Sequence, residues 1–256
     1  MPQNIKRNAI LNISTNGVTA FTHGFHKYPA KFIPLIPRWA IKKYLNGSKN
    51  KTILDPFCGS GTTLVEGILA GHNAIGFDID PLSSMISKAK TTRVDVIGLN
   101  EVANWLINGI KNRKKGLFKP DCETIEHWFT DDAIRKLSII RTLINQIPDK
   151  FGTDKKTKDI QKLLLICFSS IIRRVSNADD ESQKTYVSHT KIKEPEEVFA
   201  LFLSQLNLFI ERISRFSEIT DPKLTSKVVC SSSIQSLTKK ITKQTIDLAV
   251  TSPPIH

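Results

Sequence analysis

Thr52-Ile-Leu-Asp-Pro-Phe-Cys-Gly-Ser-Gly-Thr-Thr-Leu, residues 52–64, decides the fold of this chain. It begins as a short apolar strand, breaks at Pro56 and crosses two glycines, Gly59 and Gly61. Thr62 and Thr63 are expected to cap a helix that ends at Gly71. A strand, a glycine turn and a helix N-terminus in this order predict a pocket for a small, partly charged cofactor.

A second strand is expected over residues 73–78, with acids at its end. Asp78 and Asp80 follow Gly61 by 17 and 19 residues, about where nucleotide-binding folds place the acid that holds ribose hydroxyls. Pro81 is then favoured as the first residue of a helix over 81–90. These elements indicate a parallel strand–helix–strand–helix unit.

The composition is that of a globular, basic protein. The 256 residues are 40% hydrophobic, and the net charge of +13 favours a polyanionic partner, with nucleic acid first and an acidic membrane surface second. The four cysteines lack metal or disulfide spacing, and His23 and His26 lack a third ligand, so no metal is expected. The N-terminus has no signal-peptide pattern and the apolar run 163–172 is too short to span a bilayer, so we expect a cytoplasmic protein.

The middle of the chain has a helical period instead of the strand–helix alternation. Apolar positions repeat at helical spacing over 102–110, 131–147, 160–175 and 198–216. We therefore expect a helical insertion in an α/β frame. Three domains are expected. Residues 1–95 form an N-terminal segment with the cofactor-binding half of the core, and residues 96–222 form the helical insertion, a candidate DNA-recognition module. Residues 223–256 return to the core and end in the Ser-Pro-Pro motif.

The α/β pattern resumes with candidate strands at 225–230 and 245–250. The second runs into Thr251-Ser-Pro-Pro, where each proline fixes φ and removes a hydrogen-bond donor. Carbonyl groups at the carboxyl end of such a strand lie where open α/β sheets bind substrate.

These motifs together resemble the S-adenosylmethionine-dependent DNA amino-methyltransferases, which methylate cytosine N4 or adenine N6. Asp55-Pro-Phe-Cys-Gly-Ser-Gly-Thr-Thr resembles their cofactor loop, and Thr251-Ser-Pro-Pro their catalytic tetrapeptide in its N4-cytosine form. His26-Lys-Tyr-Pro-Ala-Lys-Phe is similar to the segment that closes over the cofactor. The resemblance implies a Rossmann-like sheet, transfer of a methyl group to double-stranded DNA, and a place in a restriction–modification system.

The resemblance also implies roles for individual residues. Those that would bind S-adenosylmethionine are Lys31, Phe32, Asp55, Phe57, Gly59, Gly61, Thr62 and Asp78, with Asp80 as the alternative ribose ligand. Those that would act on a target base flipped out of the duplex are Thr251, Ser252, Pro253 and Pro254. Arg173 and Arg174 are candidates for DNA backbone contacts, with a solvated helix end as the alternative.

The sequence departs from the family pattern in three places. Ile255 replaces the aromatic residue that follows Ser-Pro-Pro, and Ser232 stands where an acid would contact the cofactor's adenine. Four core strands are expected where the family sheet has about seven, which predicts a second polypeptide completing the sheet or a truncated frame. Two alternative functions stay open. The chain is either a catalytically incomplete or split-enzyme subunit that only binds cofactor or DNA, or an RNA methyltransferase.

Overall fold

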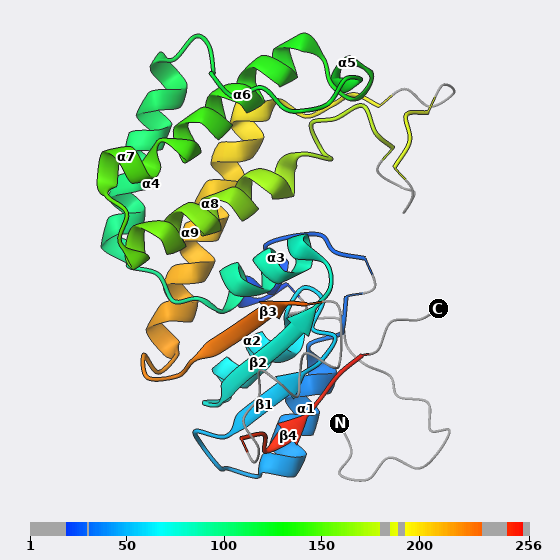
Figure 1. Cartoon of the computed structure of the whole chain (residues 1–256), viewed down its shortest axis with the longest axis vertical. Helices are drawn as coiled ribbons and strands as arrows, with labels where there is room; N and C mark the ends of the chain where they lie inside the picture. Colours follow the sequence, from blue (N-terminus) through cyan, green and yellow to red (C-terminus); the bar gives the residue numbers. More distant parts are fainter. Residues whose placement is uncertain (1–18, 30, 180–184, 189–192, 232–244, 253–256) are drawn as a thin grey trace. The chain divides into compact units, whose positions relative to one another are not determined.

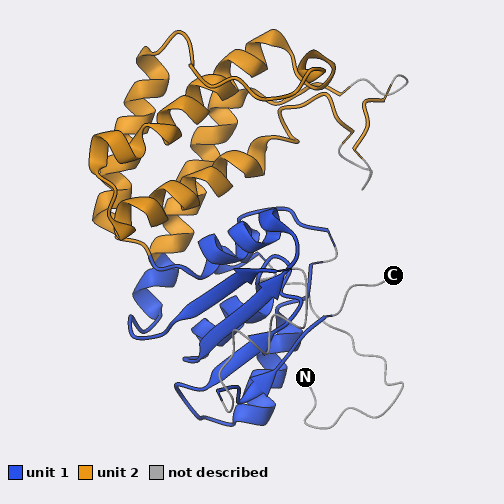
Figure 2. Ribbon diagram, viewed as in Figure 1, with its two compact units in different colours: residues 1–93, 215–256 blue, residues 94–214 orange. Residues whose placement is uncertain are grey.

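The chain forms two compact units in the computed structural model, which describes residues 19–29, 31–179, 185–188, 193–231 and 245–252. Unit 1 comprises residues 1–93 and 215–256, and unit 2 comprises residues 94–214 (Figure 2). Unit 2 ends inside a helix, earlier in the chain than the boundary at 222 that the sequence indicates. Unit 1 contains both stretches that carry the family motifs.

The described residues of unit 1 form a parallel sheet of four strands in the order β3-β2-β1-β4 (Figure 1). The strands are β1 (Thr52–Asp55), β2 (Asn73–Asp78), β3 (Ser226–Cys230) and β4 (Leu248–Ala249). The predicted α/β class and parallel sheet are therefore confirmed, although β4 is shorter than the predicted strand 245–250. Because the strands are parallel, their carboxyl ends lie along one edge of the sheet.

Three helices of unit 1 pack on one face of this sheet. They are α1 (Leu35–Leu45), α2 (Thr62–Leu69) and α3 (Pro81–Thr91), and a short 3-10 helix, η1 (Phe21–Gly24), precedes them. The central helix α2 contacts both α1 and α3 as well as β1 and β2. Its apolar residues Leu64 and Val65 are fully buried, as is Ile53 of β1, so this layer holds the core of the unit.

The start of α2 differs from the expectation. Its N-cap is Gly61, in the left-handed conformation at φ 79°, and no side chain caps the helix. The predicted capping by Thr62 and Thr63 is wrong, because both lie inside the first turn of the helix, after the N-cap position. At α3 the expectation holds: Pro81 is the first residue, and the Asp80 carboxylate caps the helix.

Unit 2 consists of helices packed around their own apolar core. They are α4 (Val96–Asn112), α5 (Ile125–Trp128), α6 (Asp131–Asn145), α7 (Ile147–Phe151), α8 (Lys155–Ile171) and α9 (Val198–Ile219), the last shared with unit 1. The predicted helix 131–147 is divided at Gln146, which is the N-cap of α7 and is followed by Pro148 in the first turn of that helix. The predicted helix 160–175 instead begins at Lys155, because Asp154 caps it.

Candidate functional site

The ends of β1 and β4 meet at the carboxyl edge of the sheet. β4 pairs with β1 at Ile53↔Leu248 and Leu54↔Ala249. The Asp55 side chain is buried at this edge, and burial raises its pKa. The hydroxyl of Thr251 opposes that rise in pKa, although it makes no hydrogen bond of standard geometry. The strand pairing therefore brings Thr251 to the edge of the sheet at which the cofactor-loop motif begins.

The glycine turn after β1 is held from two sides. The backbone amide of Cys58 donates to the carbonyl of Phe77 at 2.9 Å, and the Ser87 hydroxyl of α3 donates to the carbonyl of Gly59 at 2.6 Å. Gly59 and Gly61 both have positive φ, 48° and 79°. A Cβ on Gly61 would lie 2.8 Å from the Ser87 oxygen, so only glycine fits there.

The two acids after β2 have different surroundings. Asp78 ends the strand, and its carboxylate accepts from the amide of Gly59 at 2.8 Å and from the amide of Asp80 at 2.9 Å. The Asp80 carboxylate accepts from the amides of Leu82 and Ser83 at the start of α3. Asp78 thus borders the glycine turn, whereas Asp80 is occupied in capping a helix.

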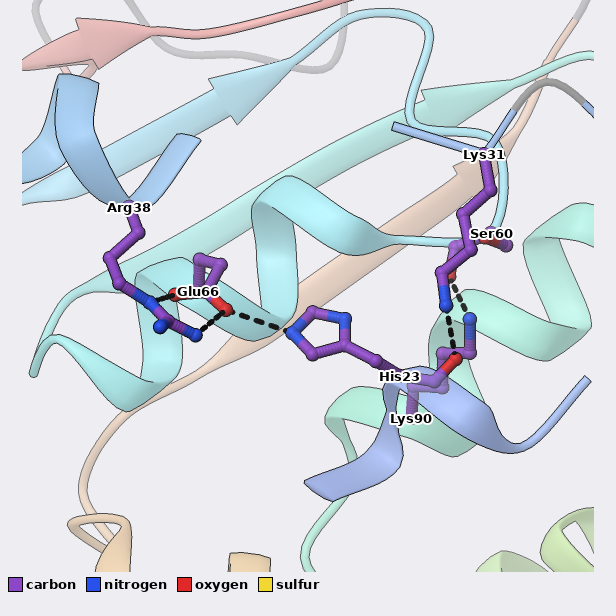
Figure 3. A network of polar contacts seen from close by, with 6 residues as sticks. All are labelled: His23, Lys31, Arg38, Ser60, Glu66 and Lys90. Carbon is purple, nitrogen blue, oxygen red and sulfur yellow. Dashed lines mark hydrogen bonds and ion pairs between the residues drawn. The ribbon is translucent and has the colours of Figure 1, made fainter. Parts of the chain in front are cut away.

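A polar cluster around the buried Glu66 of α2 joins that helix to η1 and to α1 (Figure 3). Glu66 of α2 is 2% exposed; it accepts two hydrogen bonds from the Arg38 guanidinium, at 2.7 and 2.8 Å, and lies 2.9 Å from Nε2 of the buried His23. Burial raises the pKa of Glu66, but the contacts with Arg38 and His23 outweigh it and the net pKa is lowered. Burial also lowers the pKa of His23, so a neutral imidazole donates from Nε2 to an ionised carboxylate.

Two lysines bind backbone carbonyls beside the glycine turn. The ammonium of Lys31 donates to the carbonyl of His23 at 2.6 Å, and that of Lys90 in α3 donates to the carbonyl of Ser60 at 2.9 Å (Figure 3). Lys90 is fully buried, and burial together with the charge of Lys31 lowers its pKa to about 7. A buried lysine of α3 therefore holds the turn between Gly59 and Gly61 through the carbonyl of Ser60.

Sequence reasoning missed Glu66 and Lys90. Each had a local signal: Glu66 is the acid in the otherwise apolar helix Thr62–Leu69, and Lys90 lies on the face of α3 that also carries Ser83 and Ser87. A charged residue within an apolar or small-residue face indicates a buried partner.

The other residues singled out from the sequence are placed as follows. Phe57 is 37% exposed beside the turn, Phe32 is half-buried, Thr62 is buried and Ser252 is exposed. Ser232, Pro253 and Pro254 lie outside the described residues.

The arginines proposed for DNA contacts are engaged within unit 2. The guanidinium of Arg173 donates to the carbonyl of Asp179, and that of Arg174 forms two hydrogen bonds with the carboxylate of Glu196, at 2.6 and 2.7 Å. Contact between Arg174 and a DNA phosphate would therefore require its ion pair with Glu196 to break.

The described part of the chain holds neither a metal-binding cluster nor a helix suited to crossing a membrane. No cluster of three or more His, Cys, Asp or Glu side chains there has the geometry of a metal site. No helix there has the length and apolar character that crossing a membrane requires.

Comparison with known proteins gives consistent matches. Residues 11–89 match the family model described as DNA methylase, of the N6 and N4 type. The chain is 28% identical over 96% of its length to the type II methyltransferase M.MvaI of Kocuria varians, covering 56% of that protein. It is also 28% identical over 64% of its length to the type II methyltransferase M.MjaII of Methanocaldococcus jannaschii, covering 30% of it.

A third relative is M.BsoBI, a type II methyltransferase of Geobacillus stearothermophilus, with 25% identity over 81% of this chain and 44% of that protein. The chain spans about half or less of the length of these relatives. No solved structure matches it.

Proposed function

We propose, from the premise that the chain belongs to the family of N4-cytosine and N6-adenine DNA methylases, that it methylates cytosine N4 in double-stranded DNA. The methyl donor is S-adenosylmethionine. The observation that carries this proposal is the parallel pairing of β1 with β4, which brings Asp55 and Thr251 to one edge of the sheet.

The residues along this edge fit the proposed cofactor. A Cβ at Gly61 would meet Ser87 at 2.8 Å, and Gly59 has a positive φ of 48°, so both positions favour glycine. Two residues without a Cβ suit close approach of a ligand to the backbone. Asp78 offers a carboxylate beside the turn for ribose hydroxyls, and its oxygens retain lone pairs after accepting two amide hydrogen bonds. The buried Asp55 suits the positive charge of the methionine half. When bound, the cofactor supplies a methyl group activated on a sulfonium.

The residues at the end of β4 are assigned to the target amine. An exocyclic amine is a weak nucleophile because its lone pair is delocalised into the ring. The Ser252 side chain and the Ser252 carbonyl are assigned as acceptors for the two amine hydrogens, which directs the lone pair away from the ring plane. The amine nitrogen would gain the methyl group as the donor's carbon–sulfur bond breaks to leave a neutral thioether, and the surplus amine proton would pass to water. Thr251 borders Asp55 and aligns this segment with the cofactor edge.

Methyl transfer tests the proposal directly. The purified chain is incubated with duplex DNA and methyl-labelled S-adenosylmethionine, and the DNA is digested and analysed by mass spectrometry. The expected product is N4-methylcytosine, and the Ser252→Ala variant is expected to lower the rate without weakening cofactor binding. N6-methyladenine as the product would contradict the cytosine assignment, and label in RNA but not DNA would contradict the substrate class.

A second candidate function is a part of a split enzyme that binds cofactor or DNA without transfer. It is favoured by the position of β4, the outermost strand of the described sheet on that side. An outer strand offers unpaired backbone groups to a further strand from another polypeptide. Calorimetric binding of S-adenosylmethionine together with absent methyl transfer would favour this candidate.

A further inference from the structure

The positive charge of the chain is concentrated in unit 1. Unit 1 has 18 Lys and Arg and 7 Asp and Glu, a net charge of +11, whereas unit 2 has 19 and 17, a net charge of +2. No Asp or Glu precedes Asp55, although that part of the chain has nine Lys and Arg. The electrostatic attraction for a polyanion is therefore greater at the unit with the glycine turn than at the helical unit.

The basic residues also differ in their pairing. In unit 2, Lys136 is held by Asp132 and Glu197, and Arg174 is held by Glu196. In unit 1, Lys42 and Lys43 of α1 have no carboxylate within ion-pair distance among the described residues. The internal pairing of unit 2 satisfies much of its charge, whereas the α1 lysines are available to an external anion.

The outer side of α1 combines these lysines with aromatic rings. We call Trp39, Lys42, Lys43 and Tyr44 the α1 surface. The Lys43 ammonium lies 5.0 Å from the centre of the Trp39 ring and 5.5 Å from that of Tyr44, and Tyr44 is 61% exposed. The opposite side of α1 is anchored in the core through Ile41 and Leu45. The helix is thus held rigidly while it presents a basic, aromatic side to solvent.

We propose that the α1 surface binds the phosphate backbone of the DNA substrate. The inference rests on the proposed function, because it takes duplex DNA as the substrate. Two neighbouring lysines on a helix without acids complement a row of phosphates. A docked protein is the less favoured occupant, because lysine is depleted in protein–protein interfaces.

The salt dependence of DNA binding tests this proposal. Binding of a short labelled duplex to the whole chain is measured by fluorescence anisotropy at several salt concentrations. Each lost phosphate contact reduces the slope of log K against log salt by about 0.9, so the Lys42→Gln, Lys43→Gln double variant is expected to lose up to about 1.8. The Lys42→Arg, Lys43→Arg variant keeps the charge and should keep the slope.

A matched control is available in unit 2. Lys114 and Lys115 are also adjacent and exposed, so the Lys114→Gln, Lys115→Gln variant removes the same charge from the other unit and should leave the slope within error of the parent. An unchanged slope in the α1 variant, or an equal loss in the control, overturns the inference. If the unmodified chain binds DNA with no salt dependence at all, it is the proposed function that fails.

Discussion

The backbone amide of Gly59 donates to the carboxylate of Asp78 at 2.8 Å, joining the glycine turn after β1 to the end of β2. The same carboxylate accepts from the amide of Asp80, which in turn caps α3. One acid therefore orders the turn of the proposed cofactor site and the loop beside it. Its substitution affects both ligand binding and local structure, so a control is needed that separates them.

Asp78→Ala is expected to weaken binding of S-adenosylmethionine by about 10- to 100-fold, the range for losing a hydrogen bond to a charged group. Asp80→Ala is the control: it removes a helix cap and should cost about 1 kcal/mol of stability with a smaller effect on binding. Calorimetry gives the affinities. Equal losses in the two variants would contradict a direct role for Asp78.

Gly61→Ala is expected to destabilise the chain more than Gly47→Ala. Both glycines have φ near 80°, where a Cβ costs about 1–2 kcal/mol. At Gly61 the added Cβ also meets Ser87 at 2.8 Å, whereas at Gly47 nothing lies within 4 Å, so overpacking should add about 1–3 kcal/mol at Gly61 alone. Urea unfolding midpoints measure the difference. Identical midpoints would show that α3 does not press on the turn.

Arg38→Gln is expected to lower the free energy of unfolding at neutral pH by about 1–3 kcal/mol, because the buried Glu66 carboxylate loses its cation while water reaches the half-exposed position of Arg38. Glu66→Gln should lower the free energy of unfolding less than Arg38→Gln does, since it removes the buried charge itself. Arg135→Gln, which breaks an exposed ion pair with Asp132, should cost about 0–1 kcal/mol. If Arg38→Gln lowers the free energy of unfolding no more than Arg135→Gln does, the contact between Arg38 and Glu66 does not hold α1 on α2.

Lys90 predicts a pH dependence of stability. Its pKa is about 7 in the folded chain and 10.5 when exposed, so between these values the unfolded chain binds the extra proton. The free energy of unfolding should therefore rise with pH in this window, by at most about 1.4 kcal/mol per pH unit. Lys90→Met should abolish this rise, and Lys88→Met, on the exposed side of α3, should retain it. A rise that persists in Lys90→Met would assign it to another group.

Local structure followed from the sequence where short-range chemistry decides it. The spans of β1, β2 and α3 agree with the predictions because apolar runs, glycines and Pro81 act within a few residues. The start of α2 did not agree: Gly61 takes the N-cap position that the threonine side chains were expected to fill. Gly61 adopts a left-handed conformation beside Ser87, where a Cβ would not fit, and the helix starts there without a capping side chain.

The sequence by itself determined the motifs, the parallel α/β class and the kind of chemistry proposed, because glycines, prolines and strand-end acids constrain the backbone around them. Only the tertiary structure decided that β4 lies beside β1, that Glu66 binds Arg38 and His23, and that Lys90 is buried under Ser60. These contacts join residues 28 to 195 positions apart, as Glu66 to Arg38 and Thr52 to Asp247 illustrate. Packing of whole elements selects such partners, and local propensity carries no information about them.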